Sequence, residues 1–256
     1  MPAIPDGYRS RILRRWPAID YKPRAGKVRL GDLDRLWPIS RRFGFDRGQP
    51  IDRYYIESFL DANSGSIRGR VLEIGDRDYT RRFGGPRVVQ SDVLNLLPGI
   101  AQTTIRADLA EGSAIPEGQF DCIIATQTLH LIYDVPAALR TLGRALRPGG
   151  ILLLTVPGTI SQLAEDQWRE YWHWGFTGAS LGRLVRETVA DSEPQITQFG
   201  NVLVCTAFLH GMAAAELSQA DLEHRDELYP LLIAARAKRP LGEVGAPARD
   251  AAIGQP

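Results

Sequence analysis

Polar or acidic residues stand directly behind four successive apolar runs in the middle of the chain. In chain order they are Glu73 with Gly75, Asp92, Asp108, and Thr126 with Gln127. A carboxylate can accept two hydrogen bonds at once, as the two hydroxyls of a ribose require. Asp92 follows Gly75 by 17 residues, close to the offset of roughly 20 residues at which an acidic side chain grips an adenosine ribose. Asp108 is suited to accept from the exocyclic amine of adenine. Singly, each Asp also fits a turn or helix cap, but the ordered set predicts an adenosine site.

The apolar runs have the composition of strands that are buried on both faces of a parallel sheet. They cover residues 70–75, 87–92, 103–108, 120–127 and 150–158. An amphipathic helix is predicted within 134–150, a second within 178–189, and an earlier one within 51–65 with Asp52 as its N-cap. Alternating strands and helices predict an α/β fold with a doubly wound sheet. The carboxyl ends of its strands meet at one edge, where ligands bind.

Composition divides the chain into three regions. Residues 1–50 carry twelve Lys or Arg against five Asp, so they predict a basic N-terminal extension that is solvated at the surface. Residues 51–240 form the predicted domain, with a helix in 201–217 and a last strand in 229–239. Residues 241–256 are rich in Gly, Ala and Pro and predict a flexible tail.

The overall charge and the cysteines narrow the class of protein. The formal net charge is +1 over 256 residues, which argues against a nucleic-acid binder. No run approaches the roughly 18 to 20 apolar residues that a membrane span requires. Cys122 and Cys205 lie inside apolar runs, so we expect both to fill the core and not to form a disulfide or metal site. These features predict a soluble, cytoplasmic protein.

The segment FDCIIATQTLH…LRPGGILLLTVPG, with VLEIG, VVQSD and TIRADL before it, resembles the class I S-adenosylmethionine-dependent methyltransferases, and among them the type 11-like domains. The resemblance covers about residues 67–190. It implies a Rossmann-like fold, in which a mostly parallel seven-stranded sheet has helices on both faces. It also implies S-adenosyl-L-methionine as the cofactor.

The resemblance assigns a role to each polar position. Glu73 and Gly75 match the motif along the methionine moiety of the cofactor, and Asp92 matches the ribose carboxylate. The adenine-contacting pair corresponds to Asp108 and Leu109, and the residues beside the transferable methyl group correspond to Thr126 and Gln127. The family usually continues Gly-x-Gly-x-Gly after the first strand, whereas this chain has Arg77 and Tyr79. The cofactor has no phosphate that needs a ring of backbone N–H groups, and Tyr79 is a candidate to close over it.

Two histidines and an aromatic segment are the candidates for the acceptor side. His130 follows the fourth strand, and His173 lies within WREYWHWGFT; either is a candidate general base if the acceptor is protonated. The alternative for each is a structural histidine. Aromatic residues at 168, 171, 172, 174 and 176 predict either core or a substrate wall. Arg41, Arg42 and Arg47 suggest phosphate recognition.

We therefore expect methyl transfer to a small-molecule or glycan-type acceptor, phosphorylated acceptors included. A non-catalytic binding or scaffold module with the same fold stays open because of the altered glycine loop. A nicotinamide-dependent oxidoreductase is disfavoured, because no Gly-x-Gly-x-x-Gly follows the first strand. The four histidines show no metal-ligand spacing, so no metal is expected. The sequence leaves the oligomeric state open, a homo-oligomer included.

Overall fold

The computed structural model describes residues 23–163, 167–189 and 192–241. The chain divides into two units, Met1–Trp37 and Pro38–Pro256. In the smaller unit, the described residues include a short 3-10 helix, η1 (Gly31–Leu33). The larger unit therefore begins at Pro38, whereas the basic extension was expected to run to residue 50. The remaining expectations for residues 1–22 and for the tail from 242 onward lie outside the described residues.

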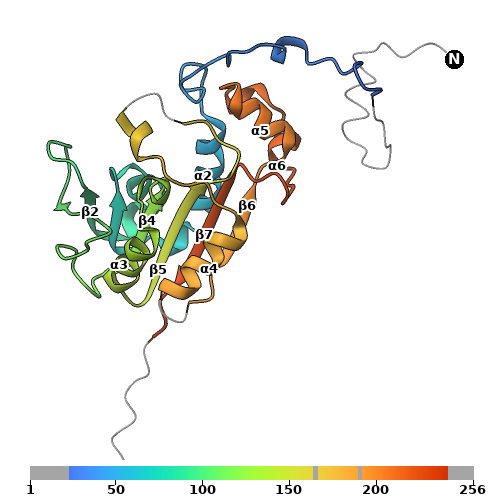
Figure 1. Ribbon diagram of the computed structural model, residues 1–256. Helices are drawn as coiled ribbons and strands as arrows, with labels where there is room; N and C mark the ends of the chain where they lie inside the picture. The colour runs from blue at the N-terminus through green and yellow to red at the C-terminus, as the bar shows by residue number, and fades with distance from the viewer. Residues whose placement is uncertain (1–22, 164–166, 190–191, 242–256) are drawn as a thin grey trace, which may run out of the picture. The chain divides into compact units, whose positions relative to one another are not determined.

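The larger unit is built on a seven-stranded sheet in the order β3-β2-β1-β4-β5-β7-β6 (Figure 1). The strands are β1 (Gly69–Ile74), β2 (Val88–Asn95), β3 (Ile105–Arg106), β4 (Phe120–Thr126), β5 (Leu146–Pro157), β6 (Gln195–Phe199) and β7 (Leu232–Lys238). Strands β1 to β5 pair in parallel, and β7 runs antiparallel to both of its neighbours. This arrangement confirms the doubly wound, mostly parallel sheet.

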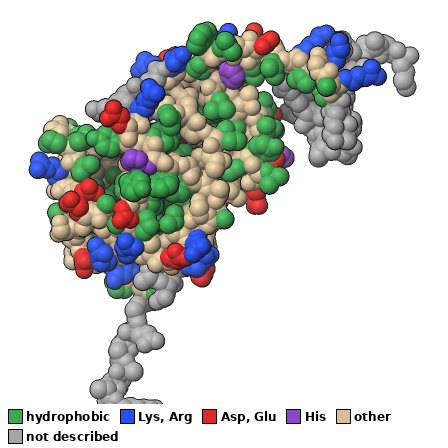
Figure 2. Space-filling view, viewed as in Figure 1, with side chains coloured by type: hydrophobic (Ala, Val, Ile, Leu, Met, Phe, Trp, Pro, Cys, Tyr) green, Lys and Arg blue, Asp and Glu red, His purple; other side chains and the backbone are tan. Residues whose placement is uncertain are grey.

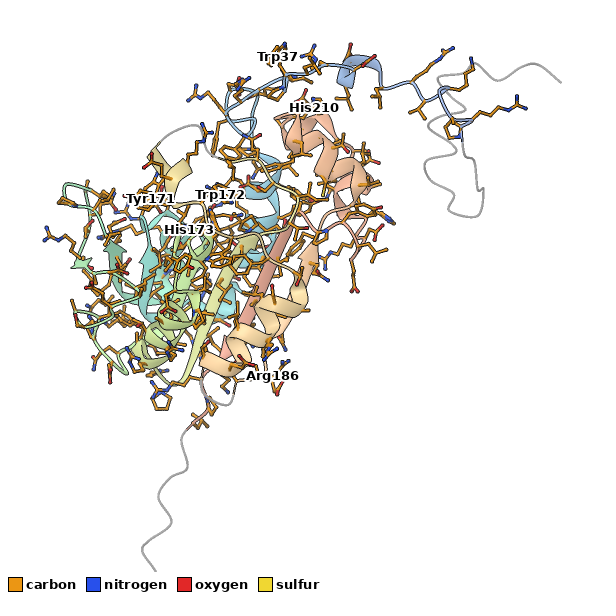
Figure 3. The ribbon with its side chains drawn as sticks, viewed as in Figure 1. Trp37, Tyr171, Trp172, His173, Arg186 and His210 are labelled. Carbon is orange, nitrogen blue, oxygen red and sulfur yellow. The ribbon has the colours of Figure 1, made fainter. Side chains whose placement is uncertain are left out.

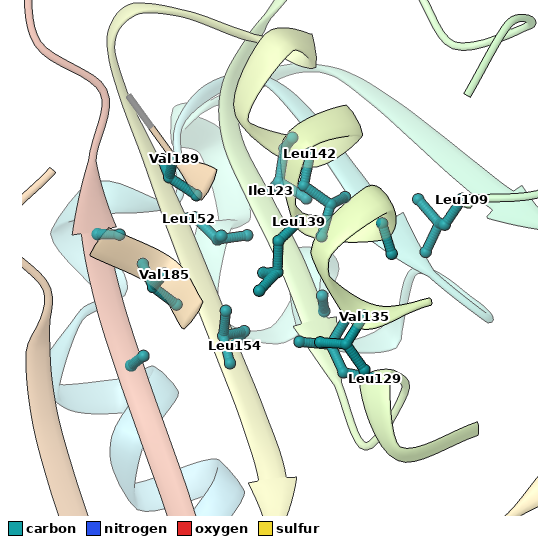
Figure 4. Close-up of a cluster of buried hydrophobic side chains, with 14 of the residues drawn as sticks. Leu109, Ile123, Leu129, Val135, Leu139, Leu142, Leu152, Leu154, Val185 and Val189 are labelled. Carbon is teal, nitrogen blue, oxygen red and sulfur yellow. The ribbon is translucent and has the colours of Figure 1, made fainter. Parts of the chain in front are cut away.

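Helices cover both faces of this sheet, as expected. They are α2 (Ile51–Ala62), α3 (Val135–Ala145), α4 (Gly178–Thr188), α5 (Val202–Leu209) and α6 (Gln219–Glu223). Side chains alternate along each strand, so one set packs under α3 and α4 and the other under α2 and α5. On the first face, Leu139 and Leu142 of α3 pack with Ile123 and Leu152 of the sheet (Figure 4).

The expectation that both cysteines fill the core is confirmed. Cys122 and Cys205 are free and buried, and both belong to the cluster under α2 and α5. Burial raises the pKa of Cys122 to about 12 and that of Cys205 to about 11. Both thiols are therefore protonated at neutral pH and behave as small apolar side chains.

The segment from Pro38 to Pro50 is anchored against the end of α5. The backbone N–H groups of Ile39 and Ser40 both donate to the carbonyl oxygen of His210, at 2.8 and 3.1 Å. Gly211, which has φ +67°, passes so close that a Cβ there would lie 2.1 Å from the Ser40 carbonyl oxygen. This glycine ends the helix, so the predicted helix over 201–217 is interrupted. The contact also fixes the loop that carries Phe43.

Candidate active site

A cavity of about 430 Å³ lies at the carboxyl ends of β1, β2 and β4. Besides these strand ends, its wall includes the loop before α2, the start of α2, the turns after β3 and β4, the segment between β5 and α4, and α5. The predicted site residues that line it are Gly75, Asp108, Leu109, Thr126, Gln127 and His130. In doubly wound sheets this edge is the one that binds ligands.

Gly75 forms the floor of the cavity at the end of β1. Its φ is +101°, and a Cβ built there would meet no atom within 4 Å. Its N–H donates to Leu94, and its carbonyl oxygen accepts from Nδ2 of Asn95 at 2.9 Å. The backbone is therefore held from below and open on the cavity side, where a ligand can approach it closely.

Glu73 lies under the loop that follows Gly75 and does not line the cavity. Its side chain is 2% exposed, and its carboxylate accepts the backbone N–H groups of Tyr79 at 3.2 Å and Thr80 at 2.7 Å. Burial raises the pKa of Glu73 to about 7, although these hydrogen bonds oppose the shift. The structure thus gives Glu73 a role in holding the loop, and its position does not support the predicted contact with the methionine moiety.

The two bulky residues of the loop turn away from the cavity. Nη2 of Arg77 donates to the carbonyl oxygen of Gln102 at 2.9 Å. Tyr79 packs beside Phe83, with ring centroids 6.1 Å apart, and joins the cluster under α2. Contrary to the prediction, Tyr79 therefore does not close over the cavity. Because neither side chain enters the space that small residues usually leave free, the missing glycines do not block it.

Asp92 is not at the end of its strand, so its predicted position is wrong. Strand β2 continues for three residues to Asn95, and Asp92 is paired with Leu72 in the middle of β1. The Asp92 carboxylate is 6% exposed and accepts from Arg70 at 2.8 Å, Gln90 at 3.0 Å and Thr104 at 3.1 Å. All its partners are structural, because neither it nor any of them lines the cavity.

Asn95 occupies the position that was expected for Asp92. It lines the cavity, is 8% exposed, and its Nδ2 donates to Gly75 and to Oγ1 of Thr103 at 3.0 Å. These two bonds orient the amide and leave its oxygen as an acceptor. The sequence could have indicated Asn95 only if β2 had been predicted to continue for three residues beyond Asp92.

Replacing Asp92 with asparagine is expected to lower the free energy of unfolding by about 1–3 kcal/mol, because the partly buried Arg70 loses its counter-charge. Affinity for S-adenosylhomocysteine is expected to change less than twofold. Urea denaturation and calorimetry of the same preparation measure the two quantities. A large loss of affinity with unchanged stability would return Asp92 to the ligand site.

The adenine-contacting role of Asp108 and Leu109 stays a prediction, with which their position is compatible. Asp108 and Leu109 both line the cavity. Oδ1 of Asp108 accepts the backbone N–H of Ala110 at 2.7 Å, which fixes the carboxylate at the turn after β3. Leu109 is 4% exposed and belongs to the core under α3, so it presents a firm apolar surface.

Gln127 has a strained backbone at the end of β4. Its φ is +46°, unusual for a residue other than Gly, Asn or Asp, and its N–H donates to the carbonyl oxygen of Thr155 at 2.9 Å. Oε1 of Gln127 is buried and has no hydrogen-bond partner among the described residues. Strain and an unpaired polar atom at one cavity residue point to a functional position.

His130 lines the cavity three residues further on and is 3% exposed. Its ring lies 4.2 Å from that of Trp172 between centroids, and its Nδ1 has no partner in the described part of the chain. Burial, with a smaller contribution from the Arg53 charge, lowers the pKa of His130 to about 3. The imidazole is thus neutral at physiological pH and a weak base, suited to hydrogen bonding.

His173 is exposed and does not line the cavity, so its position does not support the prediction that it is catalytic. Its backbone N–H donates to the carbonyl oxygen of His130 at 2.9 Å, and its ring meets that of Tyr133 edge-on at 5.5 Å. Hydrophobic side chains gather around it on the face seen in Figures 2 and 3. Tyr171, Trp172 and His173 follow one another in this segment (Figure 3), but the ring of His173 contributes to the surface.

The predicted aromatic wall is present in part. Trp168, Tyr171 and Trp172 line the cavity, whereas Trp174 donates from Nε1 to Ile132 and packs on Tyr133, and Phe176 is 4% exposed within the core. The chain adds three aromatic residues that sequence reasoning missed: Phe43, Phe45 and Phe208. Phe43, at φ +55°, packs on Phe208 at 6.0 Å.

The three arginines proposed for phosphate recognition stand outside this wall. Arg41, Arg42 and Arg47 are exposed, and none of them lines the cavity. Arg47 instead forms an ion pair with Glu216. The positions of these arginines therefore give no support to the predicted phosphate recognition.

Two charged residues of α2 line the cavity and were missed. Asp52 was expected to cap α2, but Pro50 precedes the helix and Asp52 lies in its first turn, where Oδ1 accepts the N–H of Arg53 at 2.8 Å. Burial raises the pKa of Asp52. The Arg53 guanidinium has no hydrogen bond or ion pair among the residues that the structure describes. The cavity wall therefore has a carboxyl group and a guanidinium cation on adjacent residues, which suits a ligand that carries a positive and a negative group.

Residues 54–188 match the family model described as a methyltransferase domain, which is more than half of the chain. The chain belongs to the class I S-adenosylmethionine-dependent methyltransferase family. Its mostly parallel, seven-stranded sheet matches the Rossmann-like fold of methyltransferases.

Similar proteins agree with this assignment. Nocamycin O-methyltransferase of Saccharothrix syringae is 31% identical over 100 residues, which are 38% of this chain and 34% of that protein. The similarity thus spans about a third of that relative. A SAM-dependent methyltransferase from Mesorhizobium loti has a TM-score of 0.50 and 18% identity, covering 77% of this chain and 100% of the other. The putative methyltransferase in a complex with Haloferax volcanii Trm112 has a TM-score of 0.52 and 15% identity, covering 78% and 96%.

Membrane-spanning helices and metal sites are both absent from the described part of this methyltransferase. No helix within the described ranges is long and apolar enough to cross a membrane. Among the same residues, no group of three or more His, Cys, Asp or Glu side chains is arranged to hold a metal ion.

Proposed function

We propose that this methyltransferase binds S-adenosyl-L-methionine in the cavity and methylates a small-molecule acceptor bound beside it. The observation that carries the proposal is the cavity itself, whose wall includes Gly75, Asn95 and Asp108 from the matched methyltransferase domain. When bound, the cofactor supplies an electrophilic methyl group on a sulfonium. The protein's own contribution is to orient the two reactants, which can account for about 7–11 kcal/mol of a reaction barrier.

The adenosine part fits the strand ends of β2 and β3. The oriented amide oxygen of Asn95 can accept from a ribose hydroxyl, and Asp108 can accept from the exocyclic amine of adenine. Leu109 offers a buried apolar surface for the base. A neutral amide binds a hydroxyl less strongly than a carboxylate does, so we expect moderate cofactor affinity.

The amino-acid part fits the start of α2. S-adenosylmethionine carries a carboxylate and an ammonium group, and Arg53 and Asp52 offer the opposite charges on adjacent residues of the cavity wall. Arg53 suits this role because none of the described residues pairs with its guanidinium. Gly75 contributes an open backbone on the other side.

Replacing Arg53 with methionine is expected to weaken S-adenosylhomocysteine binding about tenfold, because a charge-assisted hydrogen bond is lost while the apolar stem is kept. Calorimetry at low and moderate salt measures the change. Arg81→Met, at an exposed position outside the cavity, is the control. Equal affinity of the Arg53 variant and the wild type would remove this residue from the cofactor site.

The proposal as a whole is tested by titrating purified protein with S-adenosylmethionine and S-adenosylhomocysteine. Micromolar binding supports it. A folded protein that binds neither would favour the alternative of a non-catalytic module. We also propose a reducing, cytoplasmic location, because both cysteines are free and buried.

A further inference from the structure

One part of the cavity wall is aromatic. Among the residues that the structure describes, the aromatic side chains that line the cavity are Phe43, Phe45, Trp168, Tyr171, Trp172 and Phe208. Aromatic walls of this kind bind flat apolar molecules by burying their faces and by offset or edge-on ring contacts. The rings come from the loop before α2, from the segment after β5 and from α5, so a bound molecule would be enclosed from three sides.

Few of the side chains that line the cavity are charged. Among the described residues, the charged side chains that line the whole cavity are Asp52, Arg53 and Asp108. Under the proposed function, all three are used by the cofactor. A phosphate or carboxylate on the acceptor would have to be buried without a cation, which is strongly unfavourable. A sugar would place many hydroxyl groups against aromatic rings without partners.

Two polar atoms in this wall are left without partners. Oε1 of Gln127 and Nδ1 of His130 are buried and make no hydrogen bond to any described residue. The residues lie three positions apart after β4, and both line the cavity. Leaving two such atoms unpaired is unfavourable unless a ligand or water meets them. A hydroxyl group can donate to the amide oxygen and accept from an N–H of a neutral imidazole, so one hydroxyl would satisfy both residues.

We propose that the aromatic part of the cavity binds a planar, uncharged aromatic compound whose hydroxyl group is held between Gln127 and His130. Trp172, which packs on the His130 ring at 4.2 Å, keeps the imidazole in place and forms part of the wall. That the compound is the methyl acceptor rests on the proposed function. That it is uncharged also rests on the proposed function, because the cofactor would use the three charged side chains of the cavity. The aromatic wall and the two unpaired polar atoms do not depend on it.

The test is a set of matched probes, measured by calorimetry with and without saturating S-adenosylhomocysteine. 1-Naphthol is planar, neutral and carries one hydroxyl; 1-methoxynaphthalene lacks the donor; 1-naphthyl phosphate adds charge; methyl glucoside is a neutral sugar. We expect 1-naphthol to bind, 1-methoxynaphthalene to bind about tenfold more weakly because one hydrogen bond is lost, and the other two to show no binding. Tighter binding of the phosphate or of the glucoside than of 1-naphthol would overturn the proposal.

Two variants test whether Gln127 and His130 bind the hydroxyl group of 1-naphthol. Gln127→Met and His130→Phe keep the shape of each side chain. Each is expected to weaken the binding of 1-naphthol about tenfold, while the affinity for 1-methoxynaphthalene changes less than threefold. Gln119→Met and His224→Phe, at exposed positions outside the cavity, are the controls. Equal losses for both probes would mean that neither side chain meets the hydroxyl. The wild-type probe series decides the question even if a variant fails to fold.

The two proposals fail in different ways. Binding of S-adenosylhomocysteine without binding of 1-naphthol would overturn the acceptor class and leave the methyltransferase function standing. Binding of 1-naphthol without S-adenosylhomocysteine would support the aromatic site and count against the proposed cofactor.

Discussion

Replacing Gly75 with alanine is expected to weaken S-adenosylhomocysteine binding at least tenfold while the protein stays folded. At φ +101°, a side chain strains the backbone by an amount on the order of 1–3 kcal/mol. The strain can be relieved only by rotating a peptide that Leu94 and Asn95 hold in place. The new Cβ also lies in open space at the cavity floor, where it takes room from the ligand.

The matched control for Gly75→Ala is Gly118→Ala. Gly118 also has a positive φ, +64°, and a Cβ placed on it would have no atom within 4 Å, but it precedes β4 at the opposite end of the sheet from the cavity. We expect Gly118→Ala to lower the free energy of unfolding without lowering the affinity for S-adenosylhomocysteine. Calorimetry measures affinity and urea denaturation measures stability. If both variants bind as well as the wild type, Gly75 does not contact the cofactor.

Much of the fold could be predicted from the sequence because buried parallel strands are continuous apolar runs. Strands β1, β4 and β5 and helices α3 and α4 were found this way. Strand β6, with the sequence QITQF, was missed because it lies at the edge of the sheet and has a single neighbour, β7. An edge strand of this composition carries little hydrophobic signal.

The site was predicted less completely, for two physical reasons. Strand ends decide which side chains reach a cavity, and three residues separate the predicted end at Asp92 from the observed end at Asn95. Sequence also does not show which way a side chain turns, so Glu73 and Tyr79 were assigned to the ligand although both face the protein. Arg53 and Phe43 were missed because they reach the cavity through tertiary packing alone.

The buried carboxyl of Glu73 is expected to make the protein less stable as the pH rises from about 4.5 to above 7. Burial raises its pKa from 4.5 to about 7 in the folded state. Below pH 4.5 the group is protonated in both states. Between these values the unfolded chain releases the proton and the folded chain keeps it, so the free energy of unfolding falls as pH rises, by about 3 kcal/mol in all.

The variant Glu73→Gln isolates this effect, because an amide has the same shape and does not titrate. The other groups titrate alike in both proteins, so the difference between their unfolding free energies should change by about 3 kcal/mol between pH 4.5 and 8, in favour of the variant at high pH. Urea denaturation across this range measures it. A difference that does not vary with pH would mean that Glu73 is ionised throughout, stabilised by the N–H groups of Tyr79 and Thr80. In that event the loop beside Gly75 would be held by a full charge, and its rigidity would not depend on pH.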